Sequence, residues 1–140
     1  IGFIFQSFNL IDELNVAENI ELALLYHDMA GAERKRRVAE VMDKMGIAHR
    51  AKHMPGQLSG GQQQRVAVAR AVVGDQPLIL ADEPTGELDS ATGQQVLSLL
   101  RRVVDHEGTT VLMATHDLTV DLFADMVYHL EDGRLAEVES

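Results

Sequence analysis

Two short segments of the chain combine residue types suited to phosphate chemistry. Residues 58–65 have the sequence Leu-Ser-Gly-Gly-Gln-Gln-Gln-Arg, in which a hydroxyl, two glycines and a glutamine come directly before the helical pattern of residues 65–73. Unobstructed backbone N–H groups at a helix N-terminus favour an anion. This segment therefore predicts a phosphate-binding helix start. Its candidate residues are Ser59, Gly60, Gly61 and Gln62.

The second segment is the apolar run of residues 78–81, which ends in Asp82, Glu83 and Pro84. Such a run is typical of a buried parallel strand, and α/β sheets bind ligands at the C-terminal edge of their strands. Adjacent residues of an extended chain point in opposite directions. One carboxylate can therefore face a phosphate-bound Mg²⁺ while the other, past the strand end, faces an attacking water.

Five motifs, in order and in spacing, resemble those of the ATP-binding subunits of ABC transporters. Residues 58–62 resemble the family signature, and residues 78–83 resemble its Walker B strand. The other three are residues 5–6, similar to the Q-loop, residues 86–89, similar to the D-loop, and residues 114–117, similar to the switch-histidine loop. The resemblance implies an α/β fold, that of a P-loop NTPase-type ABC ATPase domain.

The sequence of residues 1–10, together with Thr85-Gly86, is most similar to the branch that serves lipoprotein release, macrolide export and antimicrobial-peptide efflux. In that branch the position of Glu87 is commonly Asn. The resemblance therefore implies an exporter-type ATPase, in which Glu87 of the D-loop adds a negative charge beside the implied dimer interface, where weaker closure and an altered phosphate route are both open consequences.

No segment fits the phosphate-cradling pattern G-x-x-x-x-G-K-[ST]. In the family this P-loop lies upstream of the Q-loop, and the chain opens with Ile1 inside an expected strand. We therefore expect a partial domain, a C-terminal fragment. Residues 1–8 are expected to hold the end of the early core and the Q-loop, residues 9–74 the helical subdomain with the signature, and residues 75–140 the half of the catalytic core with the remaining motifs.

The resemblance implies hydrolysis of ATP with Mg²⁺ by in-line attack of water. Gln6 and Asp82 are implied to hold the metal. Glu83 is implied to orient and deprotonate the water, and His116 to contact the γ-phosphate. Without the neighbouring motifs, Gln6 also suits a surface residue and His116 a strand-terminating histidine.

The implied nucleotide site is shared between two subunits. Ser59, Gly60, Gly61 and Gln62 are implied to close over ATP that is held by a second ATP-binding subunit in a head-to-tail dimer. Asp89 is implied to cross the dimer interface, although it equally suits the N-cap of a helix over residues 90–106. The other implied partners are transmembrane permease subunits, which place the protein at the cytoplasmic face of the cell membrane.

Two other functions are compatible with the motifs. Because half of the nucleotide site is missing, the chain as written suits an inactive interaction module better than an autonomous ATPase. A soluble ABC-type ATPase acting on ribosomes or in DNA repair also has a signature and a Walker B strand. The exporter-like Q-loop and the absence of long heptads favour the transporter.

Composition narrows the partners. The 140 residues have a formal charge of −10, with 22 acids against 12 Lys plus Arg, which disfavours binding to nucleic acid. With no cysteine, disulfides and thiolate metal sites are excluded. The five histidines other than His116 show no metal-ligand spacing. The cluster of residues 34–37 is expected to form a solvated helix face.

Local patterns predict the elements that position these motifs. Asn15 and Glu18 form a capping-box pattern for a helix to about Tyr26, and residues 38–45 have helical spacing before a capping Gly46. The remaining predictions are strands over 78–82 and 110–115, helices over 90–106 and from Leu118, and a hairpin turning at Asp132-Gly133.

Overall fold

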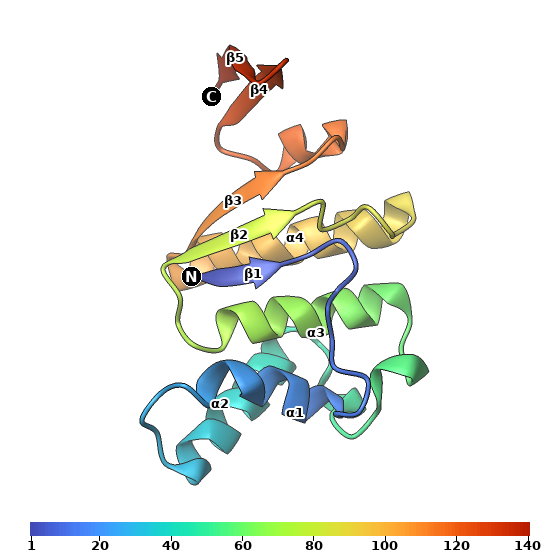
Figure 1. Cartoon of the computed structure of the whole chain (residues 1–140), viewed down its shortest axis with the longest axis vertical. Helices are drawn as coiled ribbons and strands as arrows, with labels where there is room; N and C mark the ends of the chain where they lie inside the picture. Colours follow the sequence, from blue (N-terminus) through green and yellow to red (C-terminus); the bar gives the residue numbers. More distant parts are fainter.

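A computed structural model describes residues 1–140, and Figure 1 shows how its sheet and helices are arranged. The sheet consists of β1 (Gly2–Ile4), β2 (Leu78–Asp82) and β3 (Thr110–Ala114), all parallel, with β2 in the centre. Helix α3 (Gly60–Val72) packs against β1 and against α4 (Ser90–Glu107). None of the helices is both long enough and apolar enough to cross a bilayer.

A helical group lies on the far side of α3 (Figure 1). Two helices of this group pack on α3, namely α1 (Val16–Glu21) and α2 (Gly31–Lys44). Three short 3₁₀ helices connect them to the rest of the chain, namely η1 (Leu22–Leu24), η2 (Ala48–Arg50) and η3 (Pro55–Gln57). One core cluster of 22 buried residues takes most of its members from α1, α2, α3, β2 and α4, and α3 contributes more of them than any other element.

Helix starts follow the predicted capping chemistry. The Asn15 side chain accepts from the Glu18 N–H, and Glu18 accepts from the Asn15 N–H, which closes the expected capping box. Gly46 has a φ of +70°, the left-handed conformation expected after the end of α2. In the same region the buried amide of Asn19 bonds the Ile11 N–H and three backbone carbonyls. This amide fixes the loop before α1.

Strand β2 has the expected bounds, but only Ile79 and Ala81 are buried, while Leu78 and Leu80 are partly exposed. Strand β3 ends at Ala114, one residue earlier than expected. The helix expected from Leu118 is wrong, because the segment is a five-residue 3₁₀ helix, η4 (Leu118–Leu122). The expected hairpin is confirmed as β4 (Val127–Glu131) and β5 (Arg134–Glu139).

Two further boundaries differ from expectation. The signature helix begins at Gly60 instead of Arg65, because the Ser59 and Gln62 side chains cap it at that point. Helix α1 ends at Glu21 and continues as 3₁₀ helix instead of running to Tyr26. The basic residues 34–37 lie on α2 as expected, where Arg36 and Arg37 pair with Glu33.

Candidate functional site

The predicted site residues of the sheet lie where three strands end. Ile4 pairs with Ala81, and Asp82 pairs with Ala114, so the C-terminal ends of β1, β2 and β3 are aligned. The candidates Gln6, Asp82 and His116 therefore leave the sheet at one edge. This is the edge at which α/β sheets bind ligands.

Glu83 is the most constrained of these candidates. Its φ of +46° turns the chain sharply after β2, and its N–H donates to the Ala114 carbonyl at 2.8 Å. Its carboxylate accepts from the Thr115 hydroxyl at 3.2 Å and from the His116 N–H at 3.0 Å. About a quarter of the side chain is exposed (24%). The loop after β3 thus holds the carboxylate in place while water can still reach it.

The His116 ring lies fully exposed beside this carboxylate. Its Nε2 is 3.6 Å from Glu83 Oε1, beyond normal hydrogen-bond distance. The backbone of His116 therefore orients Glu83, while the ring is free to reach a ligand. Sequence reasoning assigned a role only to the ring and missed the backbone contact.

Asp82 and Gln6 supply the oxygen donors of this edge. Asp82 is the exposed last residue of β2, and no ion pair of the chain involves it. Gln6 is exposed two residues beyond β1, and its amide lies against Gly86, where an added Cβ would be 2.5 Å from Gln6 Nε2. A carboxylate and an amide oxygen are ligand types that Mg²⁺ prefers. The donor set fits this metal.

The signature residues form the start of α3. Ser59 Oγ accepts from the Gln62 N–H at 3.2 Å, and Gln62 Oε1 accepts from the Ser59 N–H at 2.9 Å. The N–H groups of Gly60 and Gly61 lie in the first turn, where no carbonyl of the helix can accept them. The helix start therefore has the expected chemistry for an anion.

Both glycines stand where other side chains pack closely, and the contact is much tighter at Gly61. An added Cβ at Gly61 would lie 2.4 Å from Thr92 Cγ2 of α4, and one at Gly60 would lie 3.2 Å from Leu88 Cδ2. No hydrogen bond joins residues 59–62 to Glu83 or His116. The chain thus presents two separate groups, the strand-edge residues and the signature helix start.

Asp89 is the N-cap of α4, as one of the two expectations had it. Its Oδ1 accepts from the Thr92 N–H at 2.8 Å, and this hydrogen bond lowers the pKa of the Asp89 carboxyl. The cap places the exposed Asp89 carboxylate next to the loop of residues 86–88. Its role across a dimer interface stays a prediction.

Asp117 and Thr85 were missed by sequence reasoning. Asp117 accepts from the Thr119 hydroxyl at 2.7 Å and from the Thr119 N–H at 2.9 Å, and these bonds lower the pKa of its carboxyl. Thr85 donates its hydroxyl to the other Asp117 oxygen at 3.3 Å. The segment after Glu83 is thereby tied to the loop of His116 a second time.

Comparison with known proteins agrees with this arrangement. The sequence matches the family described as ABC transporter over residues 1–86, more than half of the chain. The chain belongs to the ABC transporter family. Its expected identity as the ATP-binding domain of such a transporter is confirmed by the relatives below.

Two relatives illustrate the branch. Over 99% of its length this ABC domain is 47% identical to MJ0796 of Methanocaldococcus jannaschii, an uncharacterized ABC transporter ATP-binding protein. Over 97% of its length it is 47% identical to the macrolide export ATP-binding/permease protein MacB of Rhodospirillum rubrum. The chain spans 61% of the first relative and 21% of the second.

Solved structures confirm the expected fold. A dimeric post-hydrolysis state of the ATP-binding cassette MJ0796, bound to ADP and Pi, has a TM-score of 0.83 at 44% identity, with 99% of this chain and 61% of that chain covered. The protein cbiO1 of Clostridium perfringens, part of the transporter complex cbiONQ, has a TM-score of 0.91 at 28% identity, with 98% and 55% covered. The chain is therefore a partial ABC ATPase domain.

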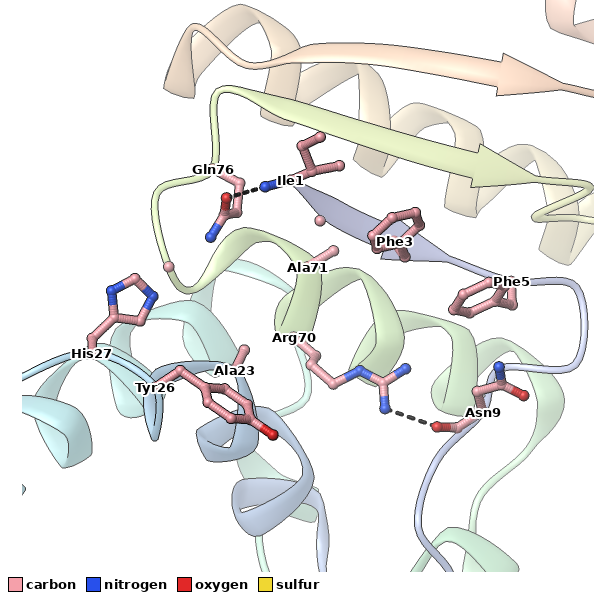
Figure 2. Close-up of a pocket in the computed structure, with 12 residues that line it drawn as sticks. Ile1, Phe3, Phe5, Asn9, Ala23, Tyr26, His27, Arg70, Ala71 and Gln76 are labelled. Atoms are coloured by element: carbon pink, nitrogen blue, oxygen red, sulfur yellow. Dashed lines mark hydrogen bonds between the residues drawn. The ribbon is translucent and has the colours of Figure 1, made fainter.

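An open pocket of the ABC domain lies away from the strand-edge residues. It has a volume of about 510 Å³ and lies between β1, the end of α3 and the segment after η1 (Figure 2). The rings of Phe3 and Phe5 stack at its wall, with centroids 6.0 Å apart. Neither Asp82 nor Glu83 lines it. The chemistry of the site is thus at an open edge instead of in a closed cavity.

The terminal hairpin brings one more group together. His129, Glu137 and Glu139 have ligand atoms within 4.8 Å of one another, although sequence spacing gave no such group. Both glutamates are exposed, and His129 Nε2 is 3.4 Å from Glu139 Oε2. His129 and Glu139 form an ion pair only when the imidazole is protonated, and His129 Nε2 has no hydrogen-bond partner.

Proposed function

We propose that this domain belongs to an ATP-hydrolysing subunit that powers an ABC exporter. The observation that supports it best is Glu83, a partly exposed carboxylate fixed at the end of the central strand by two hydrogen bonds from the loop of His116. A general base must be held within reach of its water and still be accessible to it. Glu83 meets both conditions.

In the proposed reaction, Glu83 orients a water for in-line attack on the γ-phosphoryl group of ATP and accepts its proton. The exposed His116 ring holds the phosphate. Asp82 and Gln6 are proposed to hold Mg²⁺, which neutralises charge on the phosphate oxygens. Each of these roles uses side chains that leave the sheet at the same edge.

The second half of the site is proposed to come from another subunit. The N–H groups of Gly60 and Gly61, with Ser59 and Gln62, are proposed to close over ATP held by a head-to-tail partner, with Asp89 near the interface. The relative MJ0796 forms a dimer bound to ADP and Pi. Hydrolysis then removes the ligand that joins the subunits, and the dimer opens.

The opening is proposed to drive transmembrane permease subunits, which hold the protein at the cytoplasmic face of the membrane. The similarity to MacB supports export of macrolides or chemically related cargo. We propose residues 1–8 as early core and Q-loop, 9–74 as helical subdomain, and 75–140 as catalytic core half. Residues 1–140 alone are expected to show no turnover, because they contain no G-x-x-x-x-G-K-[ST] segment.

The test uses the full-length protein that contains this chain. Glu83→Gln keeps the size of the side chain but removes the base, so we expect ATP to bind while turnover falls at least a hundredfold, in the range of lost general-base catalysis of about 10² to 10⁴. Dimers should accumulate with ATP, measured by light scattering. Glu131→Gln, the same change on the exposed edge of the hairpin, is the control and should match the parent. Parental turnover in Glu83→Gln would remove Glu83 from this role.

A further inference from the structure

Two side chains of α3 bond the backbone on both sides of Gln6. Gln64 donates through Nε2 to the Phe5 carbonyl at 3.1 Å, directly before Gln6. Arg70 donates to the Phe8 and Asn9 carbonyls at 3.1 and 2.8 Å, just after it, and Figure 2 shows the Asn9 bond. The helix that begins with the signature therefore holds the Q-loop at both ends.

The held segment has an unusual backbone. Phe8 and Asn9 have φ values of +66° and +55°, both in the left-handed region, which is costly for Phe8 and which Asn9 tolerates better. The Phe8 N–H bonds the Phe5 carbonyl at 3.3 Å, so the segment doubles back on itself. Such a conformation persists only where the surroundings impose it. The surroundings here are side chains of α3.

Arg70 has no carboxylate partner. Its guanidinium is bonded only by the two carbonyls of the left-handed pair, and no ion pair of the chain includes it. Burial lowers the pKa of Arg70. A partly buried cation that only backbone carbonyls contact loses part of its hydration without gaining a carboxylate partner. This cost indicates that the shape of this loop matters.

Gln64 connects the segment of Gln6 with the turn of Glu83. It is fully buried (0% exposed), and the same Nε2 that bonds the Phe5 carbonyl also donates to the carbonyl of Pro84, the residue after Glu83. An amide nitrogen has two protons, one for each carbonyl, so the orientation of the amide is fixed. Gln64 Oε1 has no partner. One buried side chain thus spans from Gln6 to Glu83.

We propose that Gln64 and Arg70 are positioning residues, which set Gln6 and Glu83 relative to the signature helix. The ring of Phe8 adds to this link, because it packs 3.6 Å from the position of a Cβ at Gly60. A displacement of α3 on closure over ATP therefore moves the Q-loop and the turn of Glu83 together. This inference rests on the proposed ATPase function.

The decisive variant is Gln64→Glu in the full-length protein. The substitution keeps the size of the side chain, but an ionised carboxylate has no hydrogen-bond donor for the Phe5 and Pro84 carbonyls and is repelled by their oxygens. We expect kcat at pH 8 to fall at least tenfold while KM for ATP changes less than threefold. A buried carboxyl has a raised pKa and donates one hydrogen bond when protonated. The ratio of variant to parent kcat should therefore rise at least threefold from pH 8 to pH 6.

The matched control is Gln63→Glu, the same change one residue earlier on α3. Gln63 is partly exposed and makes only a 3.4 Å contact to the Leu58 carbonyl. The ratio of Gln63→Glu kcat to parent kcat should stay constant from pH 8 to pH 6. A purely structural role of Gln64 predicts a lower melting temperature with no recovery of kcat at pH 6, which would overturn the inference.

Arg70 provides an independent test if Gln64→Glu does not fold. Arg70→Lys can keep one carbonyl bond, whereas Arg70→Met keeps none, so kcat should fall in the order parent, Lys, Met, with at least a tenfold loss for Met. Arg102→Met, on the exposed face of α4, is the control and should match the parent. Equal kcat for Arg70→Met and Arg102→Met would overturn the inference. A parent without ATP turnover would instead refute the proposed function.

Discussion

Gly61→Ala tests whether the signature glycine is required by packing as well as by phosphate binding. An added Cβ would lie 2.4 Å from Thr92 Cγ2, whereas carbon atoms in contact are about 3.5 to 4.0 Å apart. Thr92 is β-branched and stiff at χ1, and it lies in the first turn of α4, so it cannot yield freely. We expect the substitution to push α3 and α4 apart at this point.

The magnitude follows from two opposing effects. Overpacking a close contact costs about 1 to 3 kcal/mol, while Gly→Ala within a helix stabilises by about 0.5 to 1 kcal/mol. The net destabilisation is about 1 kcal/mol, within a range of about 0 to 2.5, and each kcal/mol corresponds to about 2 to 4 °C in Tm for a protein of about 150 to 250 residues. Thermal unfolding of the full-length protein, followed by circular dichroism, measures it.

Two comparisons isolate the contact. Gly31→Ala is the same change in the first turn of α2, where the nearest atom is Arg34 Nη2 at 3.7 Å, so stability should be unchanged or higher. Thr92→Ser removes the obstructing methyl but keeps a hydroxyl. In that background Gly61→Ala should cost nothing. If the loss in Tm is the same in both backgrounds, the Thr92 contact is not its cause.

Two more predictions concern the strand edge and the charge pattern of α2. Gly86→Ala should displace the flexible Gln6 side chain, whose Nε2 would be 2.5 Å from the new Cβ. ATP turnover should then fall severalfold while Tm is unchanged. Adding Gln6→Ala to Gly86→Ala should cause no further loss of turnover. If the two losses add, Gly86→Ala does not act through the Gln6 side chain. The guanidinium of Arg36 is the first cause that lowers the pKa of Glu33, from 4.5 to about 2. Because the folded-state pKa of Glu33 is depressed, the stabilisation from its carboxylate is present above pH 4.5 and is lost as the pH falls towards 2. Glu33→Gln should therefore lower the free energy of unfolding in urea at pH 7, and lower it progressively less below pH 4.5. An equal loss at pH 3 and pH 7 would show that the Glu33 carboxylate is not the source of the stabilisation.

Local sequence patterns were sufficient for the parts of the fold that local chemistry decides. The box of Asn15 and Glu18, the left-handed Gly46 and the cap at Asp89 depend on neighbours within four residues. The order of the motifs was likewise enough to identify the family and to bring Asp82 and His116 to one sheet edge.

Long-range contacts explain what the sequence could not predict. Gln64 and Arg70 are ordinary polar residues of a helical pattern, and their partners lie 20 to 62 residues away. The left-handed Phe8 lies at that contact, and the sequence pattern gave no signal for it. The segment after Leu118 has apolar spacing, but Asp117 accepts from Thr119 and winds it into a 3₁₀ turn. Tertiary hydrogen bonds override local propensity at residues 8, 64 and 70, whereas the bonds between Asp117 and Thr119 are local and span only two residues.

The charges at the strand edge indicate what a nucleotide needs in addition to this chain. Asp82, Glu87 and Asp89 take part in no ion pair, and the only one of Glu83 is with His116, which is charged only when protonated. A triphosphate therefore meets unpaired carboxylates at this edge, and Coulomb repulsion opposes its binding. Mg²⁺ and the N–H groups of a helix start can turn this net repulsion of the triphosphate into attraction. The proposed function thus requires cationic or N–H donors to be brought to this edge, and the first turn of α3 in a second subunit is the surface of this chain suited to supply them.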